Sequence, residues 1–511
     1  MRALNALTLV SIIASPALAE EPLSAIDWLK DPAPISLTQP LVTPLLDTPE
    51  ETGSTTPDVT VAPLGTTQSE TIGLLPFSTT GLPPELWSAS QADTISAMFD
   101  RISTDPLPAL QALYYTLLLA EAEAPSAQNA PSETFLQDRA ATLMRMGAVD
   151  PALALIEQAG PQQPAVFDLW FDLALLTGTE DQACRALSAN PTLTQNYETR
   201  IFCSARDGDW QTAALTFETA NALGLLDDTT GTLLAQYLDP ETIEAAPNLP
   251  PSRNMTPLGF RLFEAAGTPM PTRNLPRAFA VADLRGVSGW KAEIEAAERL
   301  AHTGALPANR LLGLYTSQRP AASGGVWERV SGVQALERAL NQNNTDAVAR
   351  ALTKLWPDMR REGLAVALAT LYGPALARLD LPTPAASMAY HAGLLSPDYE
   401  TLAQALQPNN RTDRFLQSVA LGTPDRSLAA STTEIAIAEA FGRTEASPDH
   451  RGMLDTGRLG QAILSAALQL DAAGPNQSRD IISGLSTLRA VGLEDTARRA
   501  ALQILLLKAR S

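Results

Sequence analysis

Three stretches with a common pattern decide the fold: MGAVDPALALIE (residues 146–157), TGTEDQACRALS (177–188) and DGDWQTAALTFE (207–218). The second residue of each is a glycine, and Gly147, Gly178 and Gly208 are separated by 31 and 30 residues. An alanine follows each glycine after five residues, and an apolar side chain follows after nine; these are Ala152, Ala183 and Ala213, and Ile156, Leu187 and Phe217. A glycine that ends one helix, followed by a small residue where the next helix crosses it, is typical of a helix–turn–helix repeat.

The chain around these repeats is helical in character. From Leu86 to the C-terminus, apolar residues recur at helical spacing between short loops, and alternating or β-branched runs are scarce. The sequence therefore predicts an all-α protein, an α-solenoid of stacked helical hairpins. The period is near that of tetratricopeptide repeats, but the full Trp-Leu-Gly-Tyr pattern of that repeat is missing. The C-terminal half has no clean period, so a bundle and an irregular solenoid both remain open there.

The first segment, residues 1–19, is predicted to be a signal peptide. Arg2 precedes an apolar core over residues 3–14, and Ala17-Leu18-Ala19 forms an A-x-A cleavage site, so cleavage is expected between Ala19 and Glu20. An uncleaved membrane anchor is the alternative, but the apolar core is too short to span a bilayer.

Four further segments are predicted after the signal peptide. Residues 20–84 carry recurring Pro and Thr without a sustained apolar period, which predicts a disordered spacer. Residues 85–238 are the N-terminal helical-repeat region. Residues 239–257 form a Pro-rich linker, and residues 258–511 form a C-terminal helical array.

The charge balance limits the partners. The chain has 36 Lys+Arg against 56 Asp+Glu, a formal net charge of −20. An acidic protein without a cluster of Lys, Arg and aromatic residues repels phosphate backbones, so no nucleic acid is expected as a partner. No apolar run after the signal peptide reaches membrane length, so no transmembrane anchor is expected after cleavage.

Cys184 and Cys203 are the only cysteines. Two thiols in an exported protein are expected to pair, and the hairpin arrangement puts these two on adjacent antiparallel helices. Their Cα atoms should then lie about 4.4–6.8 Å apart. A redox-active pair is the alternative, although such pairs are usually closer, as in Cys-x-x-Cys.

The sequence offers no catalytic, metal or cofactor assignment. His302, His391 and His450 lie in different helical regions and share no metal-ligand spacing. The Ser323-Gly324-Gly325 stretch suits an anion-binding nest, but a helix-connecting loop in which Ser323 caps the next helix is favoured. The patterns G-x-S-x-G and G-x-x-x-x-G-K do not occur.

One enzyme class remains as an alternative. Soluble lytic transglycosylases place an α-helical superhelix before a lysozyme-like domain with a catalytic Glu. Glu434, Glu439 and Glu445 are the nearest counterparts, but they lie in ordinary amphipathic or loop settings. Leu505 to Leu507 are expected to cover the apolar end of the array. Five tryptophans at helical spacing are expected to be wedges between helices: Trp170, Trp210, Trp290, Trp327 and Trp356.

Several stretches together carry a family resemblance. LPFSTTGLPPELW (75–87), IFCSARDGDWQTAAL (201–215), and the segment 290–315 followed by AASGGVWERV (321–330) resemble an uncharacterised family of exported alphaproteobacterial helical-repeat proteins. The resemblance covers most of the mature chain. It implies a periplasmic α-solenoid and lends no activity and no binding residues.

These observations predict a periplasmic or secreted helical scaffold or adaptor without catalysis of its own. Its curved helical surface would bind a protein or an envelope-polymer partner. The alternative is a peptidoglycan-acting envelope enzyme, or the helical platform of one. The identity of the partner and the oligomeric state remain open.

Overall fold

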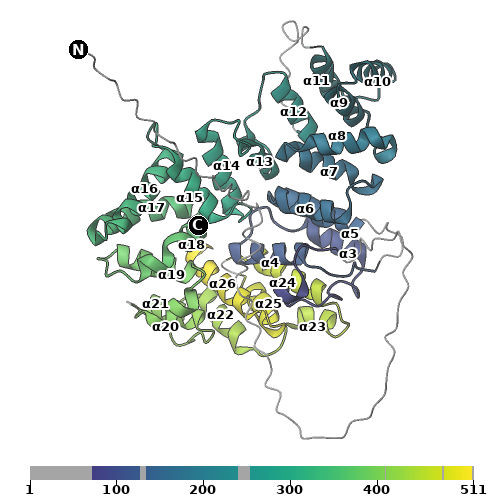
Figure 1. Cartoon of the computed structure of the whole chain (residues 1–511). Coiled ribbons are helices and arrows are strands. Elements are labelled where there is room, and N and C mark those ends of the chain that lie inside the picture. Colours follow the sequence, from purple (N-terminus) through teal and green to yellow (C-terminus); the bar gives the residue numbers. More distant parts are fainter. Residues whose placement is uncertain (1–71, 127–133, 240–253, 409, 475–476, 509–511) are drawn as a thin grey trace, which may run out of the picture.

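The computed structural model describes residues 72–126, 134–239, 254–408, 410–474 and 477–508. The predicted signal peptide and most of the predicted spacer lie outside these residues. Helices supply the regular structure of the described chain, apart from isolated backbone bridges that pair Leu75 with Ala120 and Gln91 with Ser126. The predicted all-α class of stacked helical hairpins is confirmed (Figure 1).

The helices fall into three successive groups. The first is α2 (Phe77–Thr80), α3 (Ala92–Asp100), α4 (Pro108–Leu119), α5 (Thr134–Met146), α6 (Val149–Ala159), α7 (Pro164–Thr177), α8 (Glu180–Ala189), α9 (Tyr197–Arg206), α10 (Trp210–Ala222), α11 (Asp228–Leu238) and α12 (Pro257–Ala265). The second is α13 (Ala280–Asp283), α14 (Trp290–His302), α15 (Ala308–Ser317), α16 (Val326–Asn341), α17 (Thr345–Arg361), α18 (Ala365–Ala377) and α19 (Ala385–Leu395). The third is α20 (Tyr399–Ala405), α21 (Arg411–Ala420), α22 (Thr432–Gly442), α23 (Pro448–Leu454), α24 (Leu459–Ala472), α25 (Ser478–Ala490) and α26 (Glu494–Gln503).

The repeat glycines end helices as predicted. Gly147, Gly178 and Gly208 have φ values of 90°, 82° and 87°, a left-handed backbone that glycine adopts without a steric cost. In each case the amide after the glycine bonds to a carbonyl five residues earlier, which is how a helix end satisfies its last carbonyl groups. The alanine five residues after each glycine is fully buried where the second helix crosses the first. The predicted hairpin register is therefore confirmed for α5–α6, α7–α8 and α9–α10.

The same signature recurs in the C-terminal half, where sequence analysis found no clean period. Gly457 precedes α24 with φ 75°, and Gly492 precedes α26 with φ 89°. The alanines five residues later, Ala462 and Ala497, are fully buried. The turns before α24 and α26 are therefore the same turn as in the N-terminal repeats.

Buried apolar side chains form two cores. The larger core joins residues 75–282 with residues 390–504, and the smaller core is built by residues 280–395. The two ends of the described chain thus share the larger core, and the segment between them forms the smaller one. Leu506, in the π-helical turn that follows α26, packs against both cores.

Helix α4 lies where the two ends of the larger core meet. It is apolar around most of its circumference, as expected for a helix that is buried on all sides. It packs on α24 and α26 from the far end of the chain as well as on α5. No side chain of its own segment caps its first turn. Instead, Asp471 accepts the Leu107 amide at 3.0 Å, and Gln503 accepts the Ala109 amide at 2.8 Å.

Two predicted boundaries need correction. Residues 72–84 were assigned to the disordered spacer, but Leu75 and Leu82 pack into the larger core. Leu75 also exchanges backbone hydrogen bonds with Leu119 and Glu121. The predicted linker 239–257 lies mostly outside the described residues, but α11 and α12 on its two sides contact each other. The larger core therefore continues across the linker, and no separate C-terminal unit begins at residue 258.

The contact between chain ends can be tested at Gly460, in the first turn of α24. Its amide bonds to the Leu86 carbonyl at 2.9 Å. A Cβ at this position would lie 2.6 Å from Trp87 Cε3 and 2.7 Å from the Leu86 oxygen. Alanine usually stabilises a helix relative to glycine, but we expect Gly460→Ala to lower the free energy of unfolding by about 2 kcal/mol, because overpacking outweighs propensity.

Gly452→Ala is the matched control, since a Cβ there meets no atom within 4 Å. Urea unfolding should show an unchanged or slightly raised stability, by up to about 0.5–1 kcal/mol. Equal effects of the two substitutions would contradict the close packing of α24 on Trp87.

Candidate functional site

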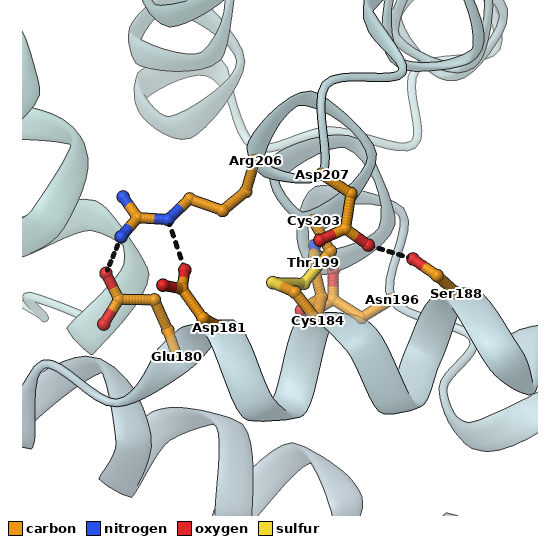
Figure 2. The surroundings of a disulfide bond; sticks show 9 residues. All are labelled: Glu180, Asp181, Cys184, Ser188, Asn196, Thr199, Cys203, Arg206 and Asp207. Carbon is orange, nitrogen blue, oxygen red and sulfur yellow. Dashed lines mark hydrogen bonds and ion pairs between the residues drawn. A yellow bond between two sulfur atoms is a disulfide. The ribbon is translucent and has the colours of Figure 1, made fainter.

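The two cysteines lie on adjacent helices of neighbouring hairpins. A disulfide joins Cys184 in α8 to Cys203 in α9, with Cα atoms 4.8 Å apart, inside the range expected from sequence (Figure 2). Both side chains are buried. A thiolate can act as a nucleophile only where a reactant reaches it, so this position suits a structural bond rather than redox chemistry.

A chain of ion pairs begins one turn from the disulfide. The fully buried Glu180 contacts Arg206 at 3.2 Å and Arg261 at 2.7 Å. Arg206 also pairs with Asp181 at 2.7 Å, as Figure 2 shows. Arg261 and Arg285 both bind Glu264, at 2.5 and 2.6 Å. The network connects α8 and α9 with α12 and the residues after α13. Each of its side chains forms at least one ion pair, although Glu180 Oε2 and Arg261 Nε are buried without a hydrogen-bond partner.

The acids considered for an enzyme serve local structure. Glu434 forms a capping box with Ser431 at the start of α22. Glu439 pairs with Arg443 at 2.7 Å, and Glu445 pairs with Arg451 at 2.5 Å. The structure does not bring the three carboxylates into one site.

The three histidines also lie apart. His302 contacts the Asp105 carboxylate and, at 3.1 Å, the carbonyl of Glu362. His391 lies 3.2 Å from the buried Asp413. His450 bonds to Thr487 at 2.9 Å, and burial lowers its pKa. Among the described residues, no group of three or more His, Cys, Asp or Glu side chains is arranged to hold a metal ion.

One unusual acid was not noticed in the sequence. Burial, and then the negative charge of Asp168 one turn away, raise the pKa of Asp172 to about 7. Acids with such a pKa are candidates for proton transfer. Among the described residues, no nucleophilic or cationic side chain forms a hydrogen bond with Asp172.

The glycine pair before α16 differs in detail from its prediction. The helix begins after Gly325, which has a φ of 54° and provides no side-chain cap. Ser323 therefore does not cap the helix as expected, and the loop is exposed.

The tryptophans divide into two kinds. Trp170 and Trp356 are buried as predicted, and Trp290 packs on Trp327 with ring centroids 5.0 Å apart. Trp210 differs: it touches Tyr237 on one side, yet half of its surface (50%) is exposed. Its prediction as a core wedge is wrong.

Trp210 belongs to an exposed apolar surface that we call the α10 edge. It consists of Trp210, Leu215, Leu223 and Leu225, which are 50%, 69%, 66% and 50% exposed. At 3.6 residues per turn, Leu215 and Leu223 lie about 80° apart around the helix axis, whereas Trp210 lies about 140° from Leu215. Helix α10 packs on α9 and α11, and no further hairpin of the described residues covers its other side (Figure 1). The α10 edge is therefore a candidate binding surface.

Comparisons of the chain with protein-family models, curated proteins and solved structures give no match. A search of the described helices finds none that is long and apolar enough to cross a membrane.

Proposed function

We propose that the protein is a non-catalytic scaffold or adaptor that binds a partner protein through the α10 edge. The observation that carries this proposal is the grouping of four large exposed apolar side chains on one helix and its following turn. We infer that these side chains act as one surface, because a contiguous exposed apolar patch marks an interaction site, whereas single exposed apolar residues need no explanation. The end hairpin of a stack normally has a polar outer face when it faces water.

The charges around the α10 edge specify the partner. Asp209 precedes α10, Glu218 lies within it, and Asp227 and Asp228 begin α11. The nearby cations are occupied, since Arg206 pairs with Asp181 and Arg200 bonds to the Thr194 carbonyl. An acidic rim around an apolar strip favours an amphipathic helix with leucine-like anchors and flanking Lys or Arg. A second copy of this chain would instead bring two acidic rims together.

A photo-crosslinking experiment tests this proposal. A benzophenone amino acid at position 215 in cells of the source organism should capture one protein with a basic amphipathic segment. The double variant Leu215→Glu/Leu223→Glu should lose at least about tenfold in affinity for that protein. The loss of two buried apolar anchors and the cost of burying two carboxylates outweigh the attraction of the new charges to its basic flanks.

Val287→Glu is the matched control, because Val287 is an exposed apolar residue (74%) far from α10 in sequence. The Val287→Glu variant should bind the partner with wild-type affinity. The melting temperatures of Val287→Glu and of Leu215→Glu/Leu223→Glu should both equal that of the wild type. Capture of the same protein by a benzophenone amino acid at position 287 would contradict the proposal. Wild-type affinity in Leu215→Glu/Leu223→Glu would contradict it as well.

We further infer that the protein acts outside the cytoplasm. The signal-peptide pattern of residues 1–19 and the paired cysteines both fit an oxidising compartment. N-terminal sequencing of the protein from the periplasmic fraction should begin at Glu20. A cytoplasmic protein that retains Met1 would contradict export without affecting the α10 edge.

A further inference from the structure

We propose that a second surface, a groove between α17 and the start of α19, binds a small organic anion with an apolar body. Residues 349–354 of α17 form one wall of this groove, and residues 382–385 form the other. Its volume is about 400 Å³. That is within the range of sites for small molecules, about 300–1,000 Å³.

Two cations stand on the α17 wall. Arg350 and Lys354 are one helical turn apart, so they project to the same side of the helix, and both are exposed. Neither forms an ion pair or a side-chain hydrogen bond with another described residue. Asp346 and Asp358 lie one helical turn before Arg350 and one turn after Lys354, and neither is paired with them; Asp358 pairs with Arg361 at 3.0 Å instead. The α17 wall therefore presents two cations that no described side chain pairs, between acids on the two flanking turns.

The rest of the groove is apolar with two hydroxyl groups. Ala349, Pro382, Pro384 and Ala385 provide carbon surface, and Thr353 and Thr383 provide the hydroxyls. The Thr353 hydroxyl donates to the Ala349 carbonyl at 2.8 Å, so its oxygen can still accept a hydrogen bond. A guanidinium and an ammonium above an apolar floor match a ligand with a carboxylate or phosphate head on a compact apolar body.

The cavity and its two cations carry this inference, and one further feature agrees with it. Helix α19 begins at the groove wall, and Pro384 before it provides no side-chain cap. The positive end of the helix dipole adds to the attraction for an anion. The groove and the α10 edge lie on different parts of the molecule (Figure 1), so either proposal can fail without the other.

Binding can be measured by isothermal titration and saturation-transfer NMR with four probes of one size: benzoate, phenyl phosphate, benzyl alcohol and benzylammonium. We expect benzoate or phenyl phosphate to bind with a millimolar or lower dissociation constant at low salt, and to weaken as salt is added. Benzyl alcohol and benzylammonium should bind at least about tenfold more weakly, because they cannot pair with Arg350 and Lys354. Whichever anion binds more tightly identifies the head group.

Three variants separate the groove from general electrostatics. Arg350→Gln/Lys354→Gln should weaken anion binding about tenfold or more. Thr353→Leu should also weaken it, because the larger side chain fills the groove and leaves both charges in place. Arg414→Gln/Arg426→Gln removes two exposed cations from other helices and loops and should leave binding unchanged.

Circular dichroism and thermal unfolding of each variant establish that the fold is kept. No binding of either anion at 10 times the expected concentration range, equal binding of benzyl alcohol, or wild-type affinity in the Arg350/Lys354 variant would each overturn the proposal. An equal loss in the Arg414/Arg426 variant would show attraction to net charge alone and would overturn it as well.

Discussion

Replacing Arg139 by Met is expected to lower the free energy of unfolding by about 3 kcal/mol. Arg139, in α5, is buried and has no carboxylate partner in contact; it donates to the carbonyls of Leu118, Ile72 and Ala120 at 2.6, 2.7 and 2.9 Å. Burial lowers its pKa to about 10, so the side chain remains charged at neutral pH and the bonds are charge-assisted. Methionine has a similar length but leaves three buried carbonyls without this donor.

The same variant tests whether residues 72–84 belong to the fold. The Leu75 amide bonds to the Leu119 carbonyl at 3.0 Å, beside the carbonyls that Arg139 holds. Hydrogen exchange should therefore accelerate at Leu75 and Glu121 in Arg139→Met. Arg145→Met is the matched control from the same helix: its side chain is partly exposed and pairs with Asp100 at 3.4 Å, so we expect a loss of at most about 1 kcal/mol. Unchanged protection at Leu75 in Arg139→Met would contradict the role of Arg139.

The double variant Cys184→Ser/Cys203→Ser is expected to lower the free energy of unfolding by about 3 kcal/mol. The bond links residues 19 apart and restricts the unfolded chain by closing this loop. Helical content should be kept under mild conditions, because each hairpin still packs on its neighbours. Urea unfolding followed by circular dichroism gives both quantities.

Two controls isolate the bond. Ser188→Ala removes a hydrogen bond to Asp207 between the same two helices and should cost less than about 1 kcal/mol, since both groups are exposed. Thiol titration of the unfolded, unreduced protein should find no free thiol. Two free thiols in material from the periplasm would show that the bond does not form in the cell.

The features that sequence predicted are local ones. Gly178 is required by the left-handed backbone at the helix end, and Ala183 by the close crossing of the next helix. The pairing of Cys184 with Cys203 could be predicted from the same hairpin register. Such signals lie within about 30 residues of one another, the range over which a helix–turn–helix pattern can be recognised.

The features that sequence missed depend on partners far along the chain. Nothing near Leu107 shows that its amide is accepted by Asp471. The Pro-rich composition before Leu86 favoured disorder. Composition does not reveal that Arg139 bonds to the Ile72 carbonyl or that this segment packs in the same core as α4. The exposure of Trp210 could not be predicted either, because helical spacing does not tell which face a neighbouring hairpin will cover.

The placement of α4 has a consequence for the order in which the protein can mature. The amides of Leu107 and Ala109 donate to Asp471 and Gln503, which are synthesised more than 350 residues later. Until those residues leave the ribosome, α4 has an uncovered apolar surface and unsatisfied donors. The N-terminal hairpins can form early, but the larger core closes only when α24 and α26 have been made. A chain that stops before α26 therefore carries an open core, which chaperones and proteases of its compartment can recognise.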